Sequence, residues 1–297
     1  MIAHLEDFLD HLRDERGASE HTLEAYSGDV IGFLEFLKEK GKVEEPETVS
    51  VADAREYLAS LHRQGLARAT LCRRISALRS FFRFLRARGA VKTNVFSIIE
   101  IPQRERKIPE FLHSEEIDAL MNAPDLSKPS GLRDRAILEL LYATGMRVSE
   151  AAALNVKDVS GASREIRVTG KRKKERVVIT GGESKRRLDE YVAKGRAALA
   201  AQGRPAEALF LNRWGARITT RSIQRIVKKH VAAAAVARNI TPHSLRHTFA
   251  THMLHAGADI RTVQELLGHS SLTSTQIYTH IPGEKLKEIY DRTHPRA

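Results

Sequence analysis

The chain has 297 residues, 42% of them hydrophobic, and is long enough for two domains with their own cores. Lysine and arginine outnumber aspartate and glutamate by 49 to 37, and the net charge of +12 favours a nucleic-acid partner over a surface that is basic only for solubility. The single cysteine, Cys72, excludes an internal disulfide and a multi-cysteine zinc site, and without a membrane-spanning run or a signal peptide we expect a soluble, cytoplasmic protein with no membrane insertion.

Apolar residues recur at helical spacing in four stripes within the first ninety residues. The stripes lie at 2–12, 23–37, 54–61 and 71–85. Ser50 and Asp53 give the third helix a start typical of a capping box, and Gly41 ends the second. We therefore expect a four-helix N-terminal bundle over residues 1–98.

The fourth helix is rich in arginine and gives the N-terminal domain a candidate DNA-binding surface. The candidates are Arg68, Arg73, Arg74, Arg79 and Arg83. Arg73 and Arg83 lie far from the apolar stripe, so we expect the outer face to meet phosphates; the alternative is a solvated cationic face. Residues 99–110 contain two prolines and no periodicity, which indicates a linker, and Arg106 and Lys107 add to the DNA-binding candidates.

Helical patterns resume after Ser114, a candidate N-cap, in a second domain over residues 111–297. Residues 164–180 interrupt them: Ile166 and Val168 alternate, a turn follows, and residues 177–179 are apolar. This pattern predicts a β-hairpin with a cationic tip, whose candidates for contact with DNA or substrate are Lys171, Arg172, Lys173 and Lys174. The predicted fold is mainly α, with one small β-hairpin in the second domain.

The stretch LRDRAILELLYATGMRVSEAAAL reads as a helix that breaks at Thr144 and Gly145 and restarts at Arg147. An arginine at a helix start either binds an anion or pairs with a neighbouring carboxylate, here Glu150. The segment alone leaves both interpretations open.

In PHSLRHTFATHML, His243 and Arg246 stand three apart and share a helical face, with His247 in the same sector. His243 and His247 have the spacing of a helical zinc pair, but the hydrolase motif needs Glu where this chain has Ser244. A nearby arginine would also repel a dication, whereas its planar fork suits phosphate. The sequence therefore favours an anion site and no metal.

The segment after this helix brings in a further histidine and a tyrosine. Asp259 is a candidate cap for the next helix, and Gly268 ends it, so that His269 is the first residue beyond. Thr273 and Gln276 form a capping box for another helix with Tyr278 near its exposed start. Taken singly, such a tyrosine is more often structural than catalytic.

Together these segments resemble the tyrosine site-specific recombinases, also called the tyrosine integrase family. The resemblance spans nearly the whole chain and lies in LYATGMRVSE, GKRKKERVV, HSLRHTFATHML and LGHSSLTSTQIYTH. It implies that Arg147 and Arg246 clamp the phosphate, Lys171 is the hairpin lysine, His243 and His269 are the catalytic histidines and Tyr278 is the nucleophile. For the proton transfers that such chemistry needs, His243 is the candidate base and Lys171 the candidate general acid, while His269 would bind a non-bridging oxygen. Arg172 and Lys173 replace the glycine and small polar residue of many relatives, so Lys173 and Lys174 stay alternatives to Lys171.

The resemblance also implies a function: strand cleavage and rejoining through a 3′-phosphotyrosine, without metal, ATP or another cofactor, by a tetramer whose protomers clamp double-stranded DNA. The chain is most similar to the bacterial Xer recombinases, C-type, which implies resolution of chromosome dimers at cell division, a second Xer recombinase in a hetero-tetramer and a DNA translocase. A C-terminal helix with Leu286, Ile289 and Tyr290 on one side should dock in trans on a neighbouring protomer. The alternatives are a minimal phage or transposon integrase and a non-catalytic DNA-binding accessory protein.

Overall fold

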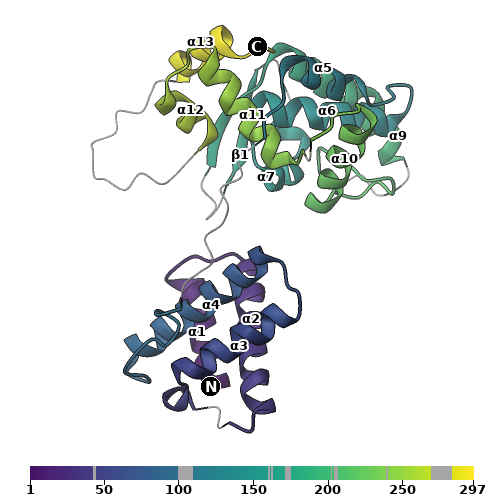
Figure 1. Ribbon diagram of the computed structural model, residues 1–297. Helices are drawn as coiled ribbons and strands as arrows, with labels where there is room; N and C mark the ends of the chain where they lie inside the picture. Colours follow the sequence, from purple (N-terminus) through teal and green to yellow (C-terminus); the bar gives the residue numbers. More distant parts are fainter. Residues whose placement is uncertain are drawn as a thin grey trace. The chain divides into compact units, whose positions relative to one another are not determined.

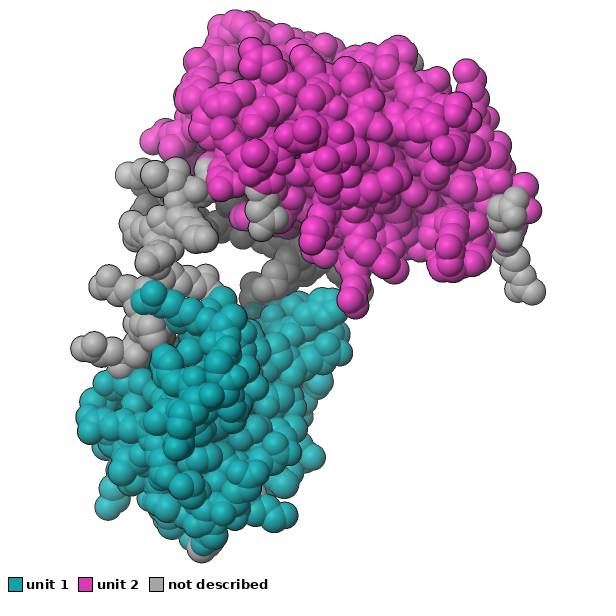
Figure 2. Space-filling model, turned by 45° about the vertical axis from the view of Figure 1, so that its right-hand side comes forward, with its two compact units in different colours: residues 1–107 teal, residues 108–297 magenta. Residues whose placement is uncertain are grey.

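The computed structural model describes residues 1–42, 45–99, 110–159, 161, 163–170, 175–201, 203, 207–238, 240–268 and 283–297. The chain divides into two compact units, Met1–Lys107 and Ile108–Ala297, coloured separately in Figure 2. Apart from one two-stranded sheet, the regular structure of the described residues is helical, which confirms the mainly α fold. No helix within those residues has the length and apolar character needed to span a membrane.

The first unit is built from α1 (Ile2–Asp14), α2 (Glu20–Glu39), the 3-10 turn η1 (Pro46–Thr48), α3 (Val51–Arg63) and α4 (Arg68–Ala87), as Figure 1 shows. The four expected helices are therefore confirmed. Phe33 is fully buried and meets Tyr57 and Phe96 edge to face, with ring centroids 5.1 and 5.2 Å away. The capping box is present: Ser50 Oγ accepts from the Asp53 N–H at 3.3 Å, and Asp53 Oδ2 accepts from the Ser50 N–H at 2.9 Å.

The arginines of α4 are used differently from one another. Arg73 donates to the buried carboxylate of Asp29 and to the Ala25 carbonyl, and Arg74 donates to the Tyr57 hydroxyl at 3.2 Å. Arg79 donates to the Phe96 and Ile99 carbonyls and so holds the end of the unit against α4. Arg68 and Arg83 are exposed. A helical wheel cannot separate these cases, because the partners lie far away in the sequence.

The helix α6 (Pro129–Thr144) lies at the centre of the second unit and is buried from Arg133 through Thr144. Packed around α6 are α5 (Ser114–Asn122), α7 (Val148–Ala153), α8 (Gly182–Glu190), the π-helical turn η4 (Tyr191–Arg196), α9 (Ala197–Ala200), α10 (Thr220–Ala233) and α11 (Pro242–His255). The short turn η2 (Val156–Asp158), α12 (Ile260–Leu267) and α13 (Gly283–Thr293) complete the unit. The N-cap of α5 is His113 and not Ser114 as predicted, because Glu116 Oε2 accepts from the His113 N–H at 2.8 Å.

The predicted β-hairpin is confirmed, with β1 (Glu165–Thr169) antiparallel to β2 (Glu175–Ile179). Val168 lies opposite Arg176, and Ile166 lies opposite Val178. Because side chains alternate along a strand, Arg176 points to the same face as the buried Val178. The tip residues 171–174 lie outside the described residues.

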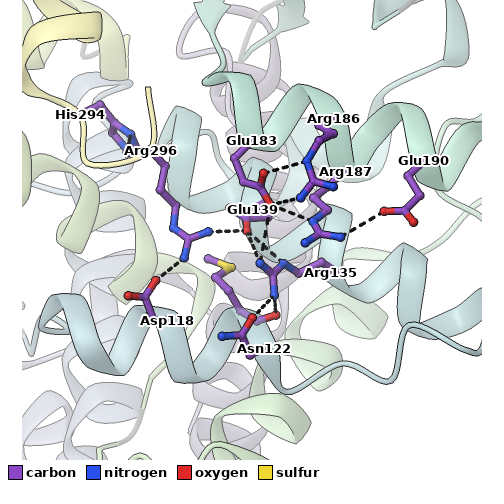
Figure 3. A network of polar contacts seen from close by, with 11 residues as sticks. Asp118, Asn122, Arg135, Glu139, Glu183, Arg186, Arg187, Glu190, His294 and Arg296 are labelled. Atoms are coloured by element: carbon purple, nitrogen blue, oxygen red, sulfur yellow. Dashed lines mark hydrogen bonds and ion pairs between the residues drawn. The ribbon is translucent and has the colours of Figure 1, made fainter.

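In the single chain the C-terminal helix α13 docks on its own unit, and the expected docking on an adjacent protomer stays a prediction. Tyr290 is fully buried in a cluster with Phe249 and Met253 of α11, and its ring stacks on His294 at 4.8 Å. Arg296 pairs with Asp118 and with Glu139, at 2.7 Å to the latter (Figure 3). A helix this short needs a partner surface to be stable, and in the single chain α11 supplies it.

Candidate active site

The turn between α6 and α7 brings three helices together. The helix α6 ends at Gly145, whose backbone is left-handed with φ of 57°. A Cβ here would lie 2.7 Å from Leu267 Cδ2 and 2.7 Å from Phe249 Cδ1, so only glycine allows both the turn and this close approach of α11 and α12. The expected break in the helix is confirmed, and it sets Arg147 at the start of α7.

Arg246 lies buried in this junction, with 6% of its surface exposed. Its Nη1 donates to the Gly145 carbonyl, and its Nη2 donates to the Leu267 carbonyl at 2.7 Å. Burial, together with the positive charges of Arg147 and Arg176, lowers the pKa of Arg246 to about 10. The guanidinium therefore stays charged at neutral pH, at a position fixed by the ends of α6 and α12.

Arg147 is held by the carboxylate of Glu150, which is itself buried. Glu150 Oε2 accepts from the Arg147 backbone N–H at 2.8 Å, and Glu150 Oε1 accepts from Arg147 Nη1 at 3.1 Å. The Arg147 side chain is nevertheless 44% exposed. The pairing with Glu150 is confirmed, and because the side chain still faces solvent, the anion-binding interpretation stays a prediction for the same residue.

Arg176 is a member of the junction that the sequence pattern did not predict. It donates to both oxygens of Glu150, at 2.6 and 2.9 Å. Burial alone would raise the pKa of the Glu150 carboxyl, but hydrogen bonds from Arg176 and from the Arg147 backbone hold it below its usual value. One signal in the sequence could have revealed Arg176: a charged residue on the inward face of a strand requires a buried partner.

Two guanidinium groups, those of Arg147 and Arg176, pair with one carboxylate, and the buried Arg246 lies close enough for their charges to lower its pKa, so this part of the junction carries two excess positive charges. Positioned donors with excess positive charge bind and stabilise phosphate oxygens on which negative charge accumulates. His243 lies exposed in the first turn of α11, one turn before Arg246. Within the described part of the chain, no group of three or more histidine, cysteine or acidic residues could hold a metal ion.

Several predicted residues lie outside the described residues. They are Arg106, Lys107, Lys171, Arg172, Lys173, Lys174, His269 and Tyr278, and the capping box at Thr273 and Gln276 lies there too. The described segment 240–268 ends beside the junction: α12 is capped by Asp259 and ends at Gly268, with φ of 66°, as predicted. A Cβ at Gly268 would lie 2.7 Å from Cδ and Nε of Arg176.

Comparison with known proteins places the chain in a family. Residues 110–284 match the model of the phage integrase family, and residues 5–89 match that of the phage integrase N-terminal SAM-like domain. A tyrosine recombinase XerC of Pelotomaculum thermopropionicum is 44% identical, over 100% of this chain and 99% of the relative. The chain belongs to the tyrosine recombinases. It is an enzyme that recombines DNA at specific sites by tyrosine-dependent strand cleavage and rejoining.

Other relatives agree. Tyrosine recombinase XerC of Bacillus subtilis is 42% identical over 98% of this recombinase and 95% of its own length. Tyrosine recombinase XerD of Oceanobacillus iheyensis is 41% identical over 99% of this recombinase and 98% of its own length. Among solved structures, XerH recombinase in a post-cleavage complex with palindromic difH substrate matches with a TM-score of 0.69 and 25% identity, over 96% of this recombinase and 82% of that chain.

Proposed function

We propose that Tyr278 of this recombinase attacks the scissile phosphate while Arg147 and Arg246 bind its non-bridging oxygens. The observation that carries the proposal is the arginine junction, where a buried Arg246 and a half-exposed Arg147 are fixed close enough for their charges to interact. Charge grows on the non-bridging oxygens as the transition state forms, and each positioned donor contributes about 3 to 4 kcal/mol. Two such groups supply a large part of the acceleration without a metal.

The remaining steps need proton transfers. A tyrosine with an ordinary pKa of about 10 needs a base or a cationic field to attack as phenolate, and His243 is the base in this scheme. Lys171 gives its proton to the leaving 5′ oxygen, with Lys173 and Lys174 as alternatives, and His269 binds a non-bridging oxygen. The 3′-phosphotyrosine retains the energy of the phosphodiester bond, so a 5′-hydroxyl reseals the strand without ATP or another cofactor.

The substrate in this proposal is double-stranded DNA, clamped by a core-binding domain over residues 1–98 and a catalytic domain over residues 111–297, joined by the basic linker at 99–110. Support comes from the XerH complex with difH and from a lambda integrase tetramer on a Holliday junction, whose 19% identity gives the fold alone. We infer a tetramer on DNA as the active form.

The biological role that we propose is resolution of chromosome dimers at cell division, in the cytoplasm. It rests on similarity over the full length to proteins named XerC and XerD. The hetero-tetramer with a second Xer recombinase and the action of a DNA translocase belong to the same proposal. The role is tested by deleting the gene and scoring chromosome dimers, with complementation by the wild type and by Tyr278→Phe.

The test of the chemistry uses a nicked recombination site whose short fragment diffuses away after cleavage. The wild type should trap a covalent adduct between protein and DNA in EDTA and without nucleotide. Tyr278→Phe keeps the ring but lacks the attacking oxygen, so it should bind the site normally and form no adduct. An adduct that persists in Tyr278→Phe, or cleavage that EDTA abolishes, would overturn the mechanism.

A further inference from the structure

We propose that Arg176 is a positioning residue of this site: it neutralises Glu150 and thereby keeps the Arg147 guanidinium available to the phosphate. The inference rests on the proposed role of Arg147 in phosphate binding. Arg176 itself does not reach the DNA in this proposal. It acts through the carboxylate that both arginines share.

The geometry divides the Glu150 carboxylate between the two arginines. Arg176 contributes two guanidinium donors, at 2.6 and 2.9 Å, in the bidentate arrangement that fixes both partners. Arg147 contributes one guanidinium donor at 3.1 Å and its backbone N–H at 2.8 Å. The Arg176 side chain is 18% exposed and that of Arg147 is 44% exposed, so the inner arginine holds the carboxylate and the outer one faces solvent.

Charge explains why the inner arginine matters. The Glu150 side chain is only 3% exposed, and a buried carboxylate demands a cationic partner. Without Arg176, Arg147 would be the remaining cationic partner of Glu150, and its guanidinium would turn inward to form a bidentate pair with the carboxylate. The site would lose the positive charge of Arg176, and the guanidinium of Arg147 would no longer point towards the phosphate, although Arg147 itself is not mutated.

A second contact places Arg176 between three segments of the site. Its side chain runs along Gly268, where even a methyl group would come within 2.7 Å of Cδ and Nε. His269 follows Gly268 directly in the chain, and Lys171 precedes Arg176 by five positions in the hairpin. Arg176 therefore links the start of α7, strand β2 and the end of α12.

The first experiment measures the rate of cleavage of a nicked site under single turnover with saturating enzyme. Arg176→Gln should slow cleavage about 10²-fold, because a small displacement of a phosphate-binding group has effects of that size. The matched control is Arg167→Gln, which removes the same charge from the exposed face of β1 and should leave the rate within about twofold. Equal rates in Arg176→Gln and wild type would overturn the inference.

The salt dependence of DNA binding separates positioning from direct contact. A residue that touches phosphate contributes about one to the slope of log affinity against log salt. In the Arg147→Ala background the proposed route from Arg176 to the phosphate is already removed, so we expect Arg176→Gln to leave the slope of that background unchanged. A further reduction by about one in that background would show that Arg176 itself binds DNA, against the proposal.

A double-mutant cycle with Glu150→Gln tests the route of the effect. If Arg176 serves to neutralise Glu150, then in the Glu150→Gln background Arg176→Gln should cost less than about threefold in rate. A second loss of about 10²-fold in that background would contradict the proposal. The cleavage rate of the double variant can still be compared with that of Glu150→Gln if Arg176→Gln alone fails to fold, because the double variant contains no unpaired buried carboxylate at position 150.

Two further variants distinguish failure of this inference from failure of the proposed function. If Tyr278→Phe or Arg147→Ala cleaves like the wild type, the proposed site is wrong. If both are inactive and Arg176→Gln is not impaired, only the role of Arg176 fails. Circular dichroism and thermal unfolding of each variant show that the compared proteins are folded.

Discussion

Two buried glutamates of the second unit, Glu150 and Glu139, each pair with two arginines, yet their surroundings differ. Each carboxylate oxygen of Glu150 accepts two hydrogen bonds, one from Arg176 and one from Arg147. Glu139 Oε1 accepts from Arg135 at 3.0 Å and from Arg296 at 2.7 Å, while Oε2 has no hydrogen-bond partner among the described residues (Figure 3). The pKa of Glu150 is lowered, whereas burial raises that of Glu139 against the opposing charges of Arg296 and Arg135.

Burial acts to raise the pKa of both carboxyl groups, and it is outweighed only at Glu150, where both oxygens accept hydrogen bonds. Glu150 is fully ligated and fixes the arginines of the proposed active site. Glu139 is only partly ligated and ties the central helix α6 to the C-terminal tail through Arg296. The first arrangement should therefore control chemistry, and the second should control stability.

The largest expected effect is on the rate of strand cleavage. Arg246→Ala removes a positioned cation from the phosphate site and should slow single-turnover cleavage of a nicked site by at least about 10²-fold. Arg296→Ala removes an arginine from the Glu139 network and should leave the rate within about threefold when the protein is folded. A loss of similar size in both variants would erase the distinction between the two networks.

The next effect is on stability. Arg296→Ala leaves Glu139 buried with a single arginine, and the loss of one partner of a buried charge should lower the free energy of unfolding by about 2 kcal/mol. Urea denaturation measures this value. Arg292→Ala is the matched control because Arg292 is exposed on α13, and we expect a change within about 0.5 kcal/mol. If Arg296→Ala and Arg292→Ala had the same free energy of unfolding, the ion pair between Arg296 and Glu139 would not stabilise the fold.

The same contrast explains what the sequence could and could not predict. Local signals were sufficient for the hairpin, for the break at Gly145 and for the end of α12 at Gly268, because these depend on neighbours in the chain. They also placed Arg147 at a helix start and Arg246 on α11. The resemblance supplied the roles of these residues, which local pattern alone left open.

The rest depends on contacts between distant residues. Arg176 and Glu150 are 26 positions apart, and the ion pair of Arg296 with Glu139 joins residues separated by 157 positions. Likewise, Arg73 lies on the polar side of its helix, but its partner Asp29 comes from another helix, 44 positions away. Periodicity identifies which face a residue occupies and not which residue it meets, so these three pairs were beyond the sequence analysis.

A smaller effect concerns pH and the tail. Burial lowers the pKa of His294 to about 3, well below the ordinary value near 6.5, so the folded state holds this histidine neutral. Its contribution to stability is complete above about pH 6.5 and falls as the pH decreases towards 3, by about 1.4 kcal/mol for each unit. Urea denaturation at pH 6.5 and 5.5 measures the first step. In His294→Phe, which keeps an aromatic ring but cannot be protonated, the loss of stability that His294 causes between pH 6.5 and 5.5 should disappear. The same loss of free energy of unfolding in wild type and variant would show that His294 is not its source.

The smallest effect should lie in the first unit and bear on affinity alone. Exposed cations of the first unit, such as Arg83 of α4, should add to DNA affinity without a role in the chemistry or in the core. Arg83→Ala should reduce the slope of log affinity against log salt by about one and leave unfolding within about 0.5 kcal/mol. Arg73→Ala is the counterpart, because Arg73 already pairs with buried Asp29, and there we expect lost stability with little change in slope. The opposite result, with Arg73 setting the salt slope, would mean that α4 exchanges its internal partner for phosphate when DNA binds.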